Sequence, residues 1–175
     1  MAIKTILTYP NELLKKPSSP VDEVNEEVRA DIADLVDTLK ASPGVGLAAP
    51  QIDIHKRIIA VDITEVYDKS VAKDKRFAKK NSCHGLNIII NPEITNMDGE
   101  KIVREGCLSV PEYTANVKRA KEVTVVGLNE NGEKIEIMAK GFEAVCFQHE
   151  IDHLDGLLFL DRIESTKHDL FRRQT

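Results

Sequence analysis

Apolar residues recur along the first part of the chain at the spacing of an amphipathic helix. One stripe is formed by Val28, Ile32, Leu35, Val36 and Leu39, which fall at the intervals of a single helical face. Asn25 stands before this stripe, where its side chain can cap a helix, and acidic residues follow it in the first turn. The pattern predicts a helix over residues 25–39, ended by the Ser-Pro-Gly sequence at 42–44.

A second apolar stripe changes its chemistry partway along. Phe142, Val145 and Cys146 stand at helical spacing, and the same face continues with His149 and His153. The segment predicts a helix over about residues 141–154, ended at the Asp-Gly pair 155–156. Buried imidazoles need partners for their ring nitrogens, so this face is a candidate for chemistry as well as for packing.

Between these helices the pattern changes to that of short strands. Residues 57–63 and 86–90 are rich in Ile and Val, which favours strands with a buried face. Asp98-Gly99 and Asn131-Gly132 are hairpin signals, and the second would join a strand over 122–128 to one over 134–138. Strands that follow one helix and precede another predict an α+β fold.

Composition narrows the class of protein. The chain has 175 residues, 42% of them apolar and 30% charged, with a net charge of −5. This balance is that of one globular domain, 1–175, and it disfavours a general nucleic-acid binder. The sequence contains no run of eighteen apolar residues, so no membrane span is expected.

Three cysteines and a basic segment add two further expectations. An odd number of cysteines without a secretory signal cannot all form disulfides, which favours a reducing cytoplasm. Residues 67–82 carry six Lys or Arg side chains between the expected strands. A solvated insertion is the favoured interpretation, and contact with a nucleic-acid surface is the alternative.

The sequence His149-Glu150-Ile151-Asp152-His153 places two histidines four residues apart on the second helix. Four residues advance a helix by about 400°, so both rings can reach one metal ion. Glu150 is turned away from that line and can act as a base for water without binding the metal. The alternative is a pair of hydrogen-bonded core histidines beside a chance glutamate.

A hydrolytic site of this kind needs a third protein ligand. After His153 the chain offers Asp155, Asp161, Glu164 and His168, none at the spacing of the extended metalloprotease motif. Upstream it offers Cys107, between a glycine and a strand-like segment. A thiolate and two imidazoles would leave a divalent cation with a net positive charge and an open position.

Three separated motifs resemble those of the peptide deformylase family, whose members remove the formyl group from N-terminal methionine. They are Gly-Val-Gly-Leu-Ala-Ala-Pro-Gln at 44–51, Glu-Gly-Cys-Leu-Ser at 105–109 and Gln-His-Glu-Ile-Asp-His at 148–153. Flanking segments agree, among them Ile-Asn-Pro at 90–92 and Asp-His-Leu-Asp-Gly at 152–156. The resemblance covers about residues 3–163 and implies small antiparallel sheets packed around a central helix with the histidine motif.

The resemblance also implies roles for individual residues. Cys107, His149 and His153 would be the metal ligands, and Glu150 would be the general base and then the acid. The Gln51 amide and the Leu108 backbone N–H would donate to the oxyanion, and Glu105 would support the histidines and pair with Arg119. The substrate pocket would be lined by Gly44, Val45, Gly46, Val103, Glu105, Gly106, Phe142, Val145 and Cys146.

The implied cofactor is one divalent ion, ferrous iron in cells, with zinc, nickel or cobalt able to replace it in purified protein. The implied substrates are N-formylmethionyl nascent peptides. The protein is expected to be a monomer in the bacterial cytoplasm, with no membrane or DNA partner. Transient ribosome contact through residues 168–175 is a further hypothesis. An endopeptidase and a non-catalytic binder of peptide or metal are the alternatives.

Two features depart from the family pattern. The basic segment 67–82 is longer than in many relatives. Thr114 stands seven residues after Cys107, where related enzymes often have arginine, so a side-chain contact to the substrate backbone is in doubt.

Overall fold

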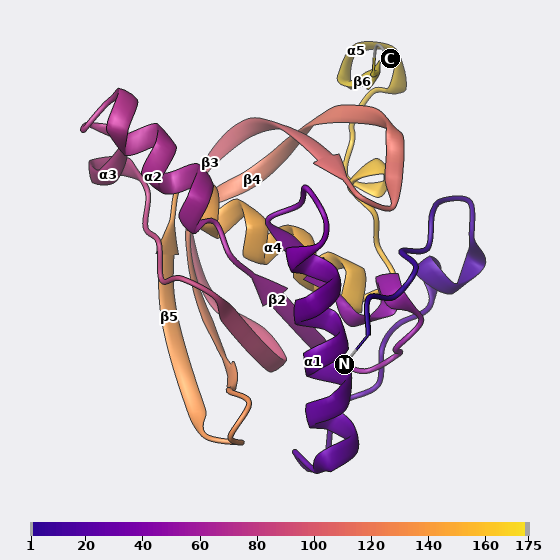
Figure 1. Ribbon diagram of the computed structural model, residues 1–175. Helices are drawn as coiled ribbons and strands as arrows, with labels where there is room; N and C mark the ends of the chain where they lie inside the picture. Colours follow the sequence, from indigo (N-terminus) through magenta and orange to yellow (C-terminus); the bar gives the residue numbers. More distant parts are fainter. Residues whose placement is uncertain (1, 174–175) are drawn as a thin grey trace.

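Antiparallel pairing joins all the strands within residues 2–173, the part of the chain that the computed structural model describes, into one sheet (Figure 1). The strand order is β1-β2-β3-β4-β5. Strand β6 pairs with a part of β4 that β5 does not reach. The strands are β1 (Gly46–Ala48), β2 (Ile58–Val61), β3 (Asn87–Cys107), β4 (Val110–Leu128), β5 (Lys134–Lys140) and β6 (Leu170–Arg172). The α+β class is confirmed, whereas the expected small separate sheets are replaced by one continuous sheet because β3 and β4 are long.

The β3–β4 hairpin is longer than the turn signals suggested. The hairpin expected at Asp98-Gly99 is wrong, because Asp98 pairs with Glu122 and Glu100 pairs with Ala120 within the same ladder. Gly99 has a φ of +62°, a backbone conformation that glycine adopts without strain, so the strand bends there and continues. The true turn is at residues 108–109, directly after Cys107. The second hairpin, at Asn131-Gly132, joins β4 to β5 as expected.

The helices begin and end close to the expected residues. The Asn25 side chain accepts a hydrogen bond from the backbone N–H of Val28 at 3.0 Å and caps α1 as expected. The helices are α1 (Glu26–Lys40), α2 (Thr64–Lys73), α3 (Phe77–Lys80), α4 (Phe142–Leu154) and α5 (Thr166–Asp169), and the 3-10 turns are η1 (Glu12–Lys15), η2 (Ala49–Ile52) and η3 (Phe159–Asp161). The histidine motif therefore lies on α4, the last long helix of the chain.

Strand β2 is buried on both faces because the two long helices pack on opposite sides of it. Ile59 and Val61 belong to the core cluster that contains α4, whereas Ile58 and Ala60 pack with α1. Alternate residues of a strand point to opposite faces, so an unbroken apolar run fits this position. The two helices hold β1, the η2 turn that follows it, and β2 in place beside the histidine motif.

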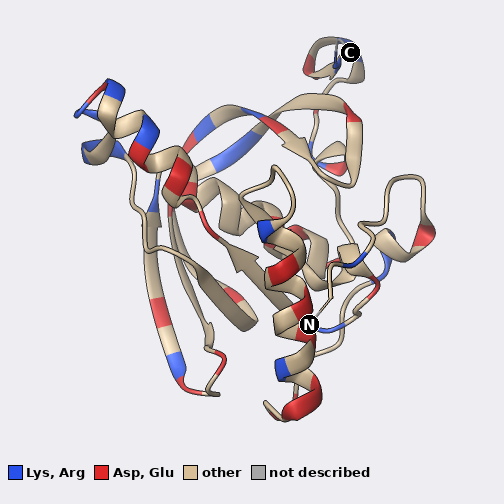
Figure 2. Cartoon of the chain, viewed as in Figure 1, with Lys and Arg blue, Asp and Glu red and all other residues tan. Residues whose placement is uncertain are grey.

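The basic segment 67–82 folds mainly into α2 and α3, which project from the rest of the molecule (Figure 1). Lys69, Lys73, Lys79 and Lys80 are exposed, and Figure 2 shows the blue of Lys and Arg along both helices. A solvated insertion is therefore what the structure has, and contact with nucleic acid stays a hypothesis.

At the other end of the chain, β6 pairs with residues 113–115 of β4. Gln174 and Thr175, part of the segment expected to contact the ribosome, lie outside the described residues. Over residues 2–173, the structure contains no helix with the length and apolar character needed to span a membrane.

Candidate active site

Three side chains from two elements meet at the end of the β3–β4 hairpin. Cys107 is the last residue of β3, and His149 and His153 stand one turn apart on α4. One potential ligand atom from each lies within 4.8 Å of the other two, and Cys107 Sγ is 3.3 Å from His153 Nε2. A thiolate and two imidazoles at this separation can hold one cation such as zinc or iron.

The orientation of His149 is fixed from behind by a buried carboxylate. The Nδ1 atom of His149 lies 2.8 Å from Glu105 Oε2. Arg119 donates to the same carboxylate, from Nε at 2.6 Å and from Nη2 at 3.0 Å. Burial alone would raise the pKa of Glu105, but hydrogen bonds from Arg119 and His149 lower it to about 2. The ionised carboxylate thus holds the ring so that its other nitrogen points toward the cluster.

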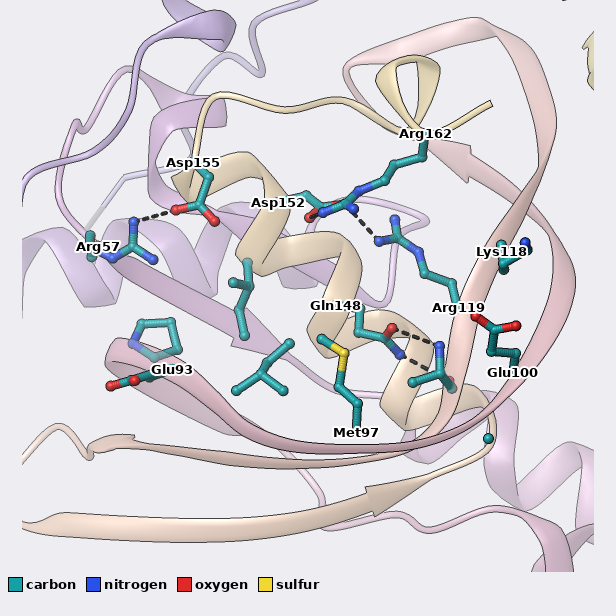
Figure 3. Close-up of a pocket in the computed structure, with 15 residues that line it drawn as sticks. Arg57, Glu93, Met97, Glu100, Lys118, Arg119, Gln148, Asp152, Asp155 and Arg162 are labelled. Atoms are coloured by element: carbon teal, nitrogen blue, oxygen red, sulfur yellow. Dashed lines mark hydrogen bonds and ion pairs between the residues drawn. The ribbon is translucent and has the colours of Figure 1, made fainter. Parts of the chain in front are cut away.

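Behind Arg119 the network continues to a residue with no role in the sequence-based expectations. Arg119 Nη1 donates to Asp152 Oδ2 at 2.7 Å, and Arg162 Nη2 donates to Asp152 Oδ1 at 2.6 Å. Figure 3 shows the guanidinium groups of Arg119 and Arg162 both directed toward Asp152, which lines a cavity of about 800 Å³. Both faces of α4 are therefore tied to β4 through Arg119, although only one face carries the histidines.

Gln51 presents its side-chain amide nitrogen to the cluster. Its Oε1 accepts from the Ala48 backbone N–H at 2.8 Å, so the NH₂ group must point the other way. Nε2 donates to Ser109 Oγ at 3.0 Å and lies 3.6 Å from Cys107 Sγ. The short η2 turn therefore fixes a preorganised donor beside the thiol.

Glu150 lies against a glycine on the opposite wall. A Cβ atom at Gly46 would stand 2.4 Å from Glu150 Oε1, so a side chain at this position would force the carboxylate to shift. Glu150 Oε2 is buried and has no hydrogen-bond partner among the described residues. Burial raises the pKa of Glu150 to about 7, against the opposing charge of His149. A carboxyl group with such a pKa can both accept and return a proton near neutral pH.

The imidazole rings of His149 and His153 are in surroundings that favour binding of a metal cation. Burial, together with the charges of His149 and Arg119, lowers the pKa of His153 well below its usual value, so this imidazole is neutral and free to coordinate. Its Nδ1 has no hydrogen-bond partner in residues 2–173. Burial alone would also lower the pKa of His149, but Cys107 and Glu105 raise it well above the usual value. The thiol and Glu105 therefore draw positive charge to this ring, and the donor set fits a divalent metal ion.

A cavity of about 780 Å³ opens above these groups. Its lining brings together all three motifs and contains every expected site residue except His153 and Arg119. The lining residues from the motifs and their flanks are Gly44, Val45, Gly46, Gln51, Val103, Glu105, Gly106, Cys107, Leu108, Phe142, Val145, Cys146, His149 and Glu150. The apolar part of this wall comes mainly from the face of α4 that precedes His149.

Further lining residues escaped the sequence-based reasoning. They are Pro43, Asn81, Lys101, Arg104, Pro111 and Arg173. The alternation of β3 could have indicated Lys101, which stands two residues before Val103 and shares its face. No comparable signal exists for Asn81, which follows α3, or for Arg173, which follows β6, because tertiary packing alone brings them to the cavity.

Comparison with known proteins agrees with this geometry. Residues 3–169 match the family described as Polypeptide deformylase. A peptide deformylase of Thermodesulfovibrio yellowstonii is 41% identical over 99% of this chain and 97% of its own length. One from Neisseria meningitidis is 42% identical over 95% of this chain and 90% of its own length.

Solved structures give the same result. A crystal structure of a peptide deformylase from Legionella pneumophila has a TM-score of 0.80 and 41% identity, covering 95% of this chain and 89% of that one. The Ehrlichia chaffeensis peptide deformylase in complex with actinonin has a TM-score of 0.84 and 34% identity, covering 95% and 92%. Together with the cluster of Cys107, His149 and His153, the family match over residues 3–169 and these relatives show that this chain belongs to the peptide deformylase family.

Proposed function

We propose that this peptide deformylase hydrolyses the formyl group from N-formylmethionyl peptides, using Glu150 as the general base. The observation that carries the proposal is the joining of two features in one cavity. Cys107, His149 and His153 can hold a metal ion, and the first two of them line the cavity together with Glu150, whose Oε2 has no hydrogen-bond partner among the described residues.

The bound cation would supply a Lewis acid that lowers the pKa of water at the cluster. Glu150 accepts the proton of the attacking water, since its raised pKa matches that task. Gln51 Nε2 and the Leu108 backbone N–H donate to the oxyanion that forms on the formyl carbonyl, and removal of such a donor typically costs about 10²–10³-fold in rate. Glu150 then returns the proton to the leaving amine as formate departs.

The methionine side chain of the substrate fits the apolar part of the cavity. Val45, Val103, Phe142, Val145 and Cys146 supply that wall, and an unbranched thioether fills such a pocket well. Gly44 and Gly46 belong to the cavity wall, and an extended peptide would pair with the backbone of this wall as an added strand.

The cofactor we propose is ferrous iron in cells, with zinc, nickel or cobalt as substitutes. A cysteine and two histidines accept all four ions, and ligand type alone does not select among them. Support comes from the donor set Cys107, His149 and His153.

We further propose that residues 1–175 act as one monomeric domain on nascent peptides in the bacterial cytoplasm, with transient ribosome contact and without membrane or DNA partners. The three cysteines are free thiols, which suits a reducing compartment. The net charge of −5 supports the exclusion of DNA.

The test is formate release from a formyl-Met-Ala-Ser peptide after anaerobic loading with each of the four metals. Wild type should release formate, and Glu150→Gln should lower kcat by about 10²–10⁴-fold with unchanged metal content. Internal cleavage of unformylated peptides without formate release would instead identify an endopeptidase. Equal background rates for wild type and variant would indicate a non-catalytic binder.

A further inference from the structure

The C-terminal strand places the guanidinium group of Arg173 at the mouth of the cavity. Strand β6 pairs with residues 113–115 of β4, and the Arg173 backbone N–H extends this ladder by donating to the Glu112 carbonyl at 2.8 Å. The Arg173 side chain lines the same cavity as the metal-ligand cluster. A residue at the C-terminal end of the described chain, far from the three motifs in sequence, thus contributes to the rim.

The guanidinium group of Arg173 lies directly on Gly106. A Cβ atom built at Gly106 would stand 2.1 Å from Arg173 Nη2 and 3.5 Å from Thr114 Cγ2. Gly106 immediately precedes the cluster residue Cys107, so this contact places the cation beside the path into the site. A side chain at position 106 would displace it.

Arg173 retains hydrogen-bond donors for a ligand, unlike its neighbour. The Arg104 guanidinium is engaged by Asn116 Oδ1 at 3.0 Å and Thr114 Oγ1 at 3.3 Å, and it lies 3.4 Å above the centre of the Phe171 ring. No carboxylate within residues 2–173 forms an ion pair with Arg173, which is exposed. Arg104 therefore fixes β6 through Phe171, while Arg173 presents free N–H groups to the cavity.

We propose that Arg173 binds backbone carbonyl oxygens of the residues that follow methionine in the substrate. A peptide with its formyl group at the cluster must leave the cavity across the rim, where Gly106 and Arg173 lie. A guanidinium offers five N–H donors in a planar fork and suits carbonyl oxygens along an extended chain. Thr114, on the neighbouring strand, is too short and uncharged to make this contact. The inference rests on the proposed deformylation and adds a substrate-contact residue from outside the three motifs.

The experiment compares two substrates, the amides of formyl-Met-Ala-Ser and of formyl-Met, using wild type, Arg173→Ala, Arg173→Lys and Arg172→Ala. Arg172 is the matched control, because it is an exposed arginine on β6 that does not line the cavity. Arg173→Ala should raise KM for the tripeptide by about tenfold, the scale of a hydrogen bond to a charged group, with kcat nearly unchanged. Its kcat/KM for formyl-Met amide should equal that of wild type. Arg173→Lys should recover part of the loss, and Arg172→Ala should match wild type on both substrates.

Several results would overturn the inference. Equal losses on both substrates would mean that Arg173 supports the fold, and melting temperatures of the variants would show the same change. Equal losses in Arg172→Ala and Arg173→Ala would mean that only net charge matters. An unchanged KM in Arg173→Ala would mean that the guanidinium does not contribute to peptide binding. A lower KM would mean that it obstructs the peptide. If wild type released no formate from either substrate, the proposed function itself would fail. If wild type and Arg173→Ala released formate equally well, only the role of Arg173 would fail.

Discussion

The three cysteines have different surroundings, although each is a free thiol. Cys107 is buried in the metal-ligand cluster. Cys146 is buried on α4, where burial and the charge of Glu150 raise the pKa of its thiol well above the usual value. Cys83 is only partly buried, with its sulfur 3.8 Å from Thr64 Oγ1. The same residue type therefore has three different tolerances to substitution.

Serine substitutions at these positions should separate metal binding from packing. Cys107→Ser should abolish formate release and lower the metal content of purified protein, because a hydroxyl is a much poorer ligand than a thiolate. Cys146→Ser should keep the metal and lower the free energy of unfolding by about 1–3 kcal/mol, the cost of burying an unpaired hydroxyl. Cys83→Ser should match wild type in both. Metal analysis and urea unfolding measure these effects, and full metal occupancy in Cys107→Ser would contradict the ligand assignment.

At the scale of elements, the insertion is tied to the beginning of α4 by a carboxylate with no exposed surface. Glu143 is fully buried. It accepts from Ser82 Oγ at 2.6 Å and from the His84 backbone N–H at 2.8 Å, and its Oε2 lies 2.7 Å from His84 Nδ1. Asn81, next to this cluster, accepts from the Phe142 backbone N–H at 2.8 Å. The exposed helices α2 and α3 therefore end in a segment that helps to fix the helix of the histidine motif.

Replacing the buried carboxylate should destabilise the protein. Glu143→Leu leaves the donors of Ser82 and His84 without an acceptor, which should lower the free energy of unfolding by about 1–3 kcal/mol. Glu136→Leu, at an exposed position of β5, is the control and should change stability by about 0.5 kcal/mol or less. Urea denaturation of both variants measures the difference. Equal stabilities would show that the Glu143 cluster contributes nothing.

Local patterns predicted those elements whose ends are set by local chemistry. Helix α1 has its Asn25 cap, and the β4–β5 turn has Asn131-Gly132. The Asp98-Gly99 pair misled because a turn signal reports only that the backbone can bend, and here the β4 partner continues on both sides of it. Pairing over the whole length of β3 depends on a distant strand, which no short window of sequence contains.

At the scale of the whole molecule, the cluster joins two parts of the chain that are far apart in sequence. Cys107 ends the first strand of the long hairpin, beside its turn, and both histidines belong to α4. The meeting of Cys107, His149 and His153 was predictable because three motifs resemble one family. The rim residues Asn81 and Arg173 were not, because each reaches the cavity through contacts made by an exposed segment elsewhere in the fold.

Metal removal should therefore weaken the fold as well as the activity. A ligand at about one hundred times its Kd stabilises the folded state by about 2.7 kcal/mol, and each 1 kcal/mol shifts Tm by about 2–4 °C in a chain of this size. Chelation should lower Tm by about 5–10 °C on this basis, measured by calorimetry. Cys107→Ser, with its damaged site, should show a much smaller change on chelation. An equal Tm with and without chelator in wild type would contradict the joining role.

The proposed ligands are far apart in sequence, so the ribosome synthesises them at different times. The hairpin that carries Cys107 is complete by residue 128, yet the last donor is residue 153. While translation is between these points, the growing polypeptide has the thiol without both imidazoles and cannot assemble the three-ligand site. With the proposed ligands, the ion would therefore be acquired late in synthesis or afterwards. Because this donor set does not choose strongly among divalent ions, the identity of the ion in a given molecule records which cation was available at that moment.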